Sequence, residues 1–274
     1  MPGYVSHTVM ARDIYNKINN KNINLEYFET YSLGGDLCKY AKCRYDSHHK
    51  DMDKFIYNMA DYLKDNNLLD DSMLLSTLYG HICHYIMDDT IHPLVRKMDK
   101  TCLKNKHNHT LIEFYYDSYL TEKIFNLKIK DYTKKGILNG KTNRKISRMI
   151  DYAYLKTYNT SNVSKYYKFN IFLYRLLNTL FILFNTNLLY KIFGVNKFIK
   201  INNSINIVND EHKILFKDYK GKECSDNLIA LYNVCIDRAI KYIDDINKYL
   251  NIWQMFDFMI IYIDWKREIY EFYQ

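Results

Sequence analysis

The sequence predicts an all-α protein, and three observations lead to that prediction. Apolar residues recur at helical spacing, for example at Met52, Phe55, Ile56, Met59 and Leu63. The 274 residues include only 8 Gly and 2 Pro, and strand-and-turn proteins normally use more of both at their corners. A hydrophobic content of 48% is enough to bury a sizeable helical core.

Eight helices are expected in chain order. The motif "DDS" caps the third of them, and Pro93 disfavours helical geometry at His92, so this helix is expected to end there. A loop containing "SLGGD" follows the first helix, residues 127–145 look basic and irregular, and the polar stretch 200–210 is the best candidate for a flexible loop. The expected helices are 6–18, 47–64, 72–91, 109–125, 144–158, 168–193, 225–250 and 252–272.

Charge and cysteine content set broad limits on the partners and the compartment. The net charge of +8 is mild for this length, so it permits an anionic partner such as a phosphate or a membrane surface without requiring one. The 28 Tyr are interpreted as compositional background. The six cysteines show no CxxC motif, which favours reduced thiols. They are Cys38, Cys43, Cys83, Cys102, Cys224 and Cys235.

Two stretches bear on targeting. The start, "MPGYVSHTVMARDIY", has no charged-then-apolar leader, so no secretory signal is visible and a cytoplasmic location is expected. Residues 170–194 are strongly apolar, but Arg175, Asn178, Asn185 and Asn187 interrupt them. This segment therefore predicts a buried helix or helix pair rather than a transmembrane element.

The histidines are unevenly distributed. Eight of the nine lie within the first 109 residues, and only His212 lies outside. This segregation indicates that the N-terminal half carries the chemistry and that the C-terminal half serves as scaffold or lid. The eight are His7, His48, His49, His81, His84, His92, His107 and His109.

The spacing of five of these polar residues predicts a metal site. His84, Asp88 and His92 are four residues apart, so they share one face of a helix, and His109 and Glu113 repeat the spacing on the next helix. Imidazole nitrogens and carboxylate oxygens are standard zinc ligands. With two oxygens, Asp88 could bridge two ions.

Other interpretations of the same residues are ordinary. A single His–Asp or His–Glu pair is typical of a solvated helix face or of a capped core histidine, and only the two pairs joined by His92 favour metal. His81 lies one turn before His84 and could orient a ligand, but packing or a solvent-facing position is favoured. Asp117 continues the face of Glu113 and is interpreted as an ordinary polar residue of that helix.

Several motifs together resemble the zinc-dependent phospholipase C family. They are "SHTVMARDI", then "GGD", a histidine opening a helix that carries "KF", "GHICHYIMDDTIHP" and "HTLIEF", over roughly residues 1–125. The chain is most similar to small, leaderless bacterial members. The resemblance implies an all-helical fold that is also used by S1/P1-type nucleases.

The resemblance implies a set of zinc ligands. One zinc would be held by Asp36, His84 and Asp88 with His48 or His49. The choice between His48 and His49 stays open, with a slight preference for His48 because it lies seven residues before Phe55 and would share its helix face.

Further ions are implied by the same resemblance. His92, His109 and Glu113 would hold a second zinc. His7 and Asp88 would contribute to a third, which secreted members complete with their processed N-terminal residue. This chain starts Met-Pro-Gly, so two to three ions are expected.

The implied activity is that of a metal-dependent phosphoric ester hydrolase. A metal-activated water would hydrolyse a phosphodiester, as in a phospholipase C, with Asp36 orienting the water or acting as base. Residues 1–126 would form the metal-binding core, and residues 127–274 would pack on it or cover it within the same domain. The substrate would be a phosphodiester or phospholipid, with peripheral membrane contact allowed.

Two alternatives remain open. One is an S1/P1-like nuclease, which would need aromatic platforms for bases, so nucleic acid is compatible with the scaffold but less favoured. The other is a non-catalytic, zinc-stabilised helical protein that binds phosphate or a partner.

Overall fold

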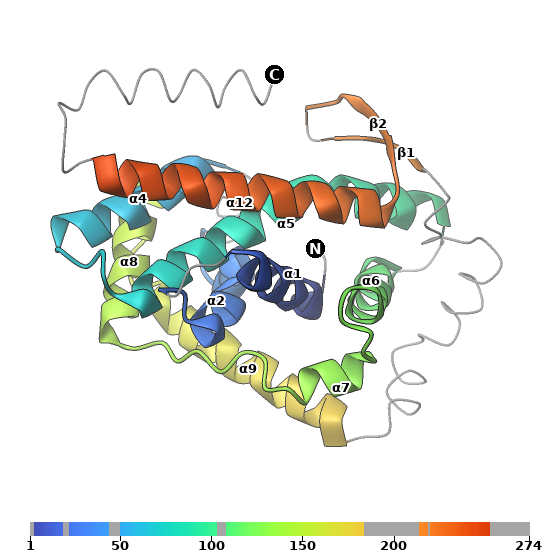
Figure 1. The fold of residues 1–274 in the computed structure, drawn as a ribbon, viewed down its shortest axis with the longest axis horizontal. Coiled ribbons are helices and arrows are strands. Elements are labelled where there is room, and N and C mark those ends of the chain that lie inside the picture. Colours follow the sequence, from blue (N-terminus) through green and yellow to red (C-terminus); the bar gives the residue numbers. More distant parts are fainter. Residues whose placement is uncertain are drawn as a thin grey trace.

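The computed structural model describes residues 3–18, 22–43, 50–102, 108–183, 214–218 and 220–252. Within these ranges the chain is helical apart from one short hairpin (Figure 1), which confirms the all-α prediction. The elements are α1 (Tyr4–Lys17), α2 (Leu25–Tyr31), the 3₁₀ helix η1 (Gly34–Cys38), α4 (Met52–Asp65), α5 (Ser72–Cys102), α6 (Asn108–Phe125), α7 (Ile129–Thr133), α8 (Arg144–Tyr158), α9 (Ser164–Leu183), β1 (Ile214–Lys217), β2 (Glu223–Asp226) and α12 (Leu228–Ile252).

Helix α5 is the centre of the fold. Helix α5 carries apolar residues on all of its faces, as expected for a helix enclosed by others. It packs against α1, α2, α4, α6, α8 and α12. Figure 1 shows α12 running along α5, with α1 and α2 below it. The side chains in the middle of α5, including those of His84 and Asp88, are therefore buried among these neighbours.

The prediction that this helix ends at His92 is wrong, because α5 continues through Pro93 to Cys102. Proline cannot donate to the carbonyl of Asp89, a loss that costs about 3 kcal/mol in a helix. The following turns bury Leu94, Val95 and Met98 almost completely. Each such side chain contributes roughly 1.5 to 3 kcal/mol, so their burial outweighs the missing hydrogen bond.

Helix α2 was not predicted, and its approach to α5 explains one glycine. The Asn24 side chain accepts a hydrogen bond from Glu26 N at 3.1 Å and caps the helix. A Cβ on Gly80 would lie only 2.6 Å from the carbonyl carbon of Tyr31. Gly80 therefore lets the end of α2, which leads into η1, pack directly on α5.

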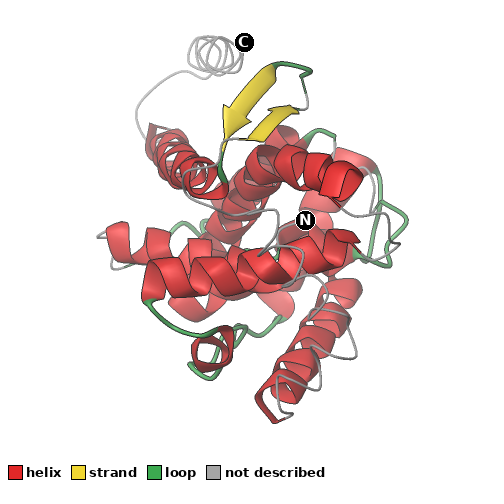
Figure 2. Cartoon of the chain, turned by 90° about the vertical axis from the view of Figure 1, so that its right-hand side faces the viewer, coloured by secondary structure: helices red, strands yellow, loops and turns green. Residues whose placement is uncertain are grey.

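Other boundaries differ from the expected ones. The helix expected at 47–64 begins at Met52, because Lys50 and Asp51 are not helical and Asp51 is left-handed at φ 51. The stretch 127–145 contains the short helix α7. The antiparallel hairpin β1–β2, which projects beside the helices in Figure 2, was not predicted. The helix expected at 252–272 and the loop at 200–210 lie outside the described residues.

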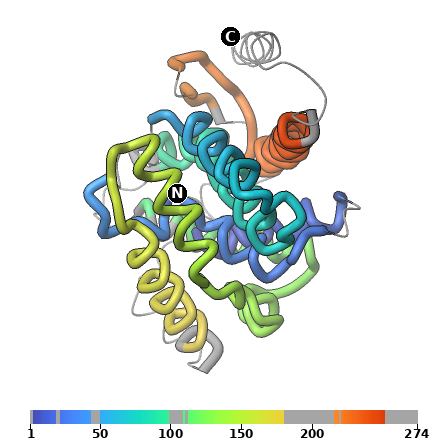
Figure 3. The backbone as a smooth tube through the Cα atoms, turned by 90° about the vertical axis from the view of Figure 1, so that its left-hand side faces the viewer, coloured from blue at the N-terminus to red at the C-terminus, as the bar shows by residue number. Residues whose placement is uncertain are grey.

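Three later helices pack on the N-terminal part of the chain. α8 lies against α4, as Figure 3 shows, and Asn170 of α9 donates to the carbonyl of Leu37 in η1 at 2.9 Å. Arg238 of α12 donates to the Asp89 carboxylate at 2.8 Å. Each of the three helices therefore supports an element of the first 126 residues.

In its described part, helix α9 departs from the expectation of a buried helix over residues 170–194. Residues 184–194 of that stretch lie outside the described residues. Tyr167, Asn170 and Ile171 are buried, but Phe169 and Phe172 are 51% and 60% exposed. Within the described ranges, no helix combines the length and the apolar character that crossing a bilayer requires.

Candidate metal centre

The start of α1 is fixed by a residue from another helix. The N-cap residue of α1, Gly3, provides no side-chain hydrogen bond to the helix. Instead the Asp117 carboxylate of α6 accepts hydrogen bonds from the Ser6 backbone N–H at 2.7 Å and from the Ser6 hydroxyl. Burial raises the pKa of Asp117 to about 7 despite these bonds. The contact holds the next residue, His7, at a fixed place in the interior.

A second approach brings η1 onto α5. Gly34 has φ +38, which favours glycine, and a Cβ there would lie 2.4 Å from Cγ of His84. With no side chain at this position, η1 packs against the His84 ring. Asp36, two residues on, is then placed beside that ring and is 4% exposed.

These two approaches assemble the first group, made of His7, Asp36 and His84. One ligand atom from each lies within 4.8 Å of the others, and all three residues are buried. The His7 and His84 ring centroids are 4.6 Å apart. Nitrogen and carboxylate oxygen at this spacing match the ligands that zinc prefers.

Asp88 faces the first group from the same helix as His84. Its Oδ1 lies 3.4 Å from His7 Nε2, and its Oδ2 lies 3.5 Å from His84 Nε2. Burial alone would raise the pKa of Asp88, but the His84, His7 and His92 rings outweigh burial and hold the pKa well below its usual value. Asp88 is therefore an anion facing imidazole rings.

The hydrogen bonding of the buried polar atoms of His7 and Asp88 tests whether a cation fits between them. Among the described residues, His7 Nδ1 has no hydrogen-bond partner, and His7 Nε2 and Asp88 Oδ1 face each other at 3.4 Å without forming a well-aligned hydrogen bond. Buried polar atoms without partners are rare and costly. A metal ion bound to His7 and Asp88 would satisfy these atoms, so the residues fit a zinc ion.

The second group consists of His92, His109 and Glu113, again with ligand atoms within 4.8 Å of one another. The two histidine Nε2 atoms are 3.4 Å apart, and His109 Nε2 lies 2.9 Å from Glu113 Oε1. Burial is the largest cause that lowers the pKa of His92, to about 3, which keeps its ring neutral and able to bind a metal. The His109 side chain is 35% exposed, so this group opens toward solvent.

His7, expected in a third site with Asp88, lies 3.4 Å from Asp88 Oδ1 and is also grouped with Asp36 and His84. His48 and His49 lie outside the described residues. Because Lys50 and Asp51 are not helical, the spacing to Phe55 no longer favours His48 over His49.

His81 is a packing residue, so the solvent-facing alternative is wrong. The residue is 1% exposed. Its Nδ1 lies 2.8 Å from the Thr77 carbonyl, and its Nε2 lies 2.9 Å from the Tyr167 hydroxyl. Burial lowers the pKa of His81 to about 4. Because both ring nitrogens of His81 are in hydrogen bonds, neither is available to bind a metal.

Three residues near the centre were missed by sequence reasoning. Asp117 was considered only as an ordinary polar residue, although its spacing from Glu113 placed it on the right face. The Tyr4 and Tyr174 rings lie with centroids 5.4 Å apart. Burial, and after it the charges of Asp36 and Glu113, raise the pKa of Tyr174 well above its usual value. In a chain with 28 Tyr, no sequence signal separates these two.

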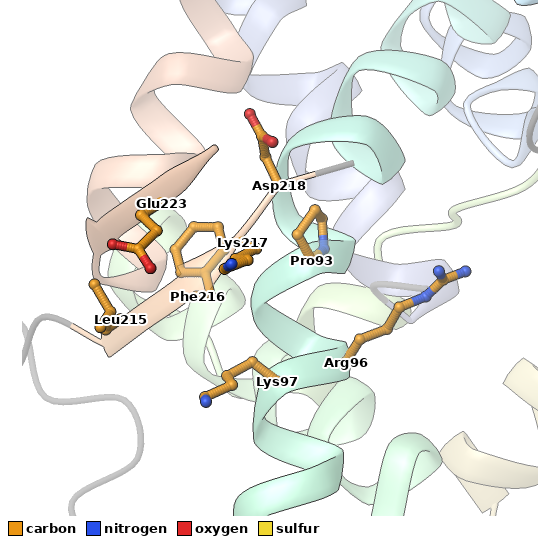
Figure 4. A pocket seen from close by; sticks show the side chains of 8 residues that line it. All are labelled: Pro93, Arg96, Lys97, Leu215, Phe216, Lys217, Asp218 and Glu223. Carbon is orange, nitrogen blue, oxygen red and sulfur yellow. The ribbon is translucent and has the colours of Figure 1, made fainter. Parts of the chain in front are cut away.

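A cavity of about 510 Å³ lies between α5 and the hairpin, starting at Pro93 (Figure 4). The charges of its lining largely offset one another, because three basic side chains stand against the carboxylates of Asp218 and Glu223. Arg96 and Lys97 extend to opposite sides of α5. The lining residues are Pro93, Arg96, Lys97, Leu215, Phe216, Lys217, Asp218 and Glu223.

Comparison with known protein families gives one match that spans this centre. The family model described as zinc dependent phospholipase C matches residues 6–176. The chain belongs to the zinc-dependent phospholipase C family. This match includes every residue of both groups, and the family's name implies a zinc-dependent hydrolase with a phospholipid substrate.

The match to the phospholipase C family ends within α9, so the hairpin and α12 lie beyond it. No curated protein and no solved structure matches the chain.

Proposed function

We propose that this protein is a zinc-dependent phosphoesterase that hydrolyses a phosphodiester in a phospholipid, in the manner of a phospholipase C. One observation carries the proposal. Two groups of histidine and carboxylate side chains, each with ligand atoms within 4.8 Å, are joined by α5, which supplies His84 to one, His92 to the other and Asp88 between them.

The proposed ligands follow these groups. His7, Asp36, His84 and Asp88 would hold one zinc ion, and the buried approach of His7 Nε2 to Asp88 Oδ1 at 3.4 Å, with poor hydrogen-bond geometry, supports this assignment. The second ion would be held by His92, His109 and Glu113. A contribution of His48 or His49, and a third ion, stay predictions.

Zinc ions bound in these groups would neutralise charge on the phosphate oxygens and activate a water for in-line attack. Asp36 would orient that water or accept its proton, since its carboxylate is buried beside His84. As the new oxygen–phosphorus bond forms, the ester bond to the alcohol breaks. The open side at His109 admits solvent, which returns a proton to the departing alcohol oxygen.

Metal analysis with matched substitutions tests the ligand set. The purified protein is expected to hold about two zinc ions per chain. Asp88→Asn should lower both zinc content and turnover, whereas Asp89→Asn, which changes the neighbouring carboxylate that bonds to Arg238, should retain zinc. Circular dichroism checks that each variant is folded. Less than about one zinc per folded wild-type chain would contradict the ligand set.

Turnover assays test the activity. Zinc-loaded protein is assayed on phosphatidylcholine, a chromogenic phosphodiester and single-stranded DNA. Hydrolysis of phosphatidylcholine with release of a phosphorylated head group is expected. Cleavage of DNA alone would support a nuclease instead, and bound zinc without turnover on any substrate would support a non-catalytic binding protein.

A further inference from the structure

Helix α9 presents an apolar stripe to solvent. Phe169, Phe172 and Leu176 are 51%, 60% and 45% exposed. Their spacing of three and four residues places them on one face of the helix. Figure 1 shows α9 along the lower edge of the molecule, and in Figure 3 its C-terminal end extends past the neighbouring helices. Contiguous exposed aromatic residues of this kind mark interaction surfaces.

Tyr40 extends this stripe onto the segment that carries Asp36. Tyr40 is 54% exposed and lies two residues after the end of η1 at Cys38. Its ring meets the Phe169 ring edge-on, with centroids 5.9 Å apart. The Asn170 bond to Leu37 fixes α9 on η1 beside this contact. We call Tyr40, Phe169, Phe172 and Leu176 the aromatic patch.

The surroundings of the aromatic patch are positively charged. Lys39, Lys42, Lys165 and Lys168 are all exposed beside it in the chain. No Asp or Glu occurs between Asp151 and Asp210. The Asp151 carboxylate is itself engaged by the N–H and the hydroxyl of Ser164. An apolar centre with lysines around it complements an anionic lipid surface, where rings enter the interface and lysines meet the head groups.

We propose that the aromatic patch docks the protein onto the surface of a bilayer that contains anionic lipids. This inference rests on the proposed function, because it places a source of phospholipid next to the residues assigned to the reaction. Helix α9 links the two places, because its Asn170 donates to the carbonyl of Leu37, the neighbour of Asp36 in η1, while Phe172 is 60% exposed.

Vesicle sedimentation of the full zinc-loaded chain tests the docking. Binding is expected to phosphatidylcholine vesicles that contain phosphatidylglycerol, and to be much weaker to phosphatidylcholine alone. The double variant Lys165→Glu, Lys168→Glu should weaken binding by roughly 30-fold or more. The double variant Phe169→Ser, Phe172→Ser should weaken it at least about tenfold.

Matched controls come from α12, where Val234 is 45% exposed and Lys241 is also exposed. The variants Val234→Ser and Lys241→Glu should bind vesicles like the wild type. Wild-type protein that binds the anionic vesicles no better than the Phe169→Ser, Phe172→Ser variant overturns the proposal. The proposal is also overturned if the wild type is a dimer in analytical ultracentrifugation, the Phe169→Ser, Phe172→Ser variant is a monomer, and the wild type binds no vesicles.

A paired activity readout separates this inference from the proposed function. For each patch variant, turnover on vesicles is divided by turnover on a soluble phosphodiester, and this ratio is expected to fall. Vesicle binding without turnover on any substrate would leave docking supported and refute the proposed activity. Turnover on the soluble substrate without vesicle binding would support the proposed activity and refute the docking.

Discussion

The two groups of the candidate metal centre are built in opposite ways. The first, His7, Asp36 and His84, is fully buried and draws on three elements that are far apart in the sequence. The second, His92, His109 and Glu113, is partly open to solvent at His109, and two of its members are one helical turn apart on α6. The difference suggests a division of roles, in which the buried group couples metal binding to folding and the open group receives substrate.

Zinc removal gives the largest expected effect on stability. Bound metal stabilises the folded state by about 4 kcal/mol when its free concentration is a thousand times the dissociation constant. If the buried group couples to folding, urea unfolding with and without a chelator should show most of this effect. His84→Gln should lose most of it, although it leaves the second group intact. If the chelator lowered the free energy of unfolding of His84→Gln as much as that of the wild type, the buried group would not be the one that couples zinc binding to folding.

The variant Gly34→Ala tests how closely η1 must approach α5. Its left-handed φ and the 2.4 Å clash with His84 should lower the free energy of unfolding by about 3 kcal/mol. Gly221→Ala is the matched control, because Gly221 has φ +82 but open space around it, so only about 1 kcal/mol of backbone strain is expected. Equal losses in denaturant unfolding would show that the contact with His84 is not tight.

The pH dependence of stability tests how a histidine outside both groups behaves. The folded pKa of His81 is about 4, below its ordinary value of 6.5, so the unfolded chain binds the extra proton. Its contribution is complete above pH 6.5 and is lost as the pH falls toward 4, in total about 2 to 3 kcal/mol. Denaturant unfolding of His81→Gln across this range should show a shallower pH dependence than the wild type. Equal slopes would mean that His81 is not held neutral.

The variant Glu113→Gln is expected to change stability least. Glutamine has nearly the same size and shape as glutamate, and the partner of Glu113, His109, is 35% exposed, so the free energy of unfolding should change by less than about 1 kcal/mol. Zinc affinity of the open group should fall roughly 10- to 100-fold, as measured by competition with a chromogenic chelator. A large loss of stability would remove the proposed division between the two groups.

The part of the centre that spacing alone predicts is the part built on single helices. Four-residue spacing identifies His84, Asp88 and His92, and likewise His109 with Glu113, because a helix fixes which residues share a face. Residues joined only by packing give no such signal. The motif resemblance alone suggested His7 and Asp36, and the spacing did not reveal that they meet at His84.

The errors in the fold have a related cause. Local rules ended α5 at His92, but burial of residues after Pro93 overrides the local preference. The hairpin β1–β2 is short, and β2 alternates between exposed and partly buried residues, a pattern too brief to predict from the sequence. The support that α12 gives through Arg238 depends on contacts 149 residues apart. We propose on this basis that both halves form one domain.

Because α5 carries His84 and His92 on one continuous helix, the offset between the two groups is set by about 12 Å of helix rise. Deleting a single residue in this interval would rotate one group by about 100° relative to the other, so neither could keep its partners. Loops elsewhere can change length without this consequence. Over evolutionary time, insertions and deletions should therefore be tolerated around α5 and excluded between its two histidines.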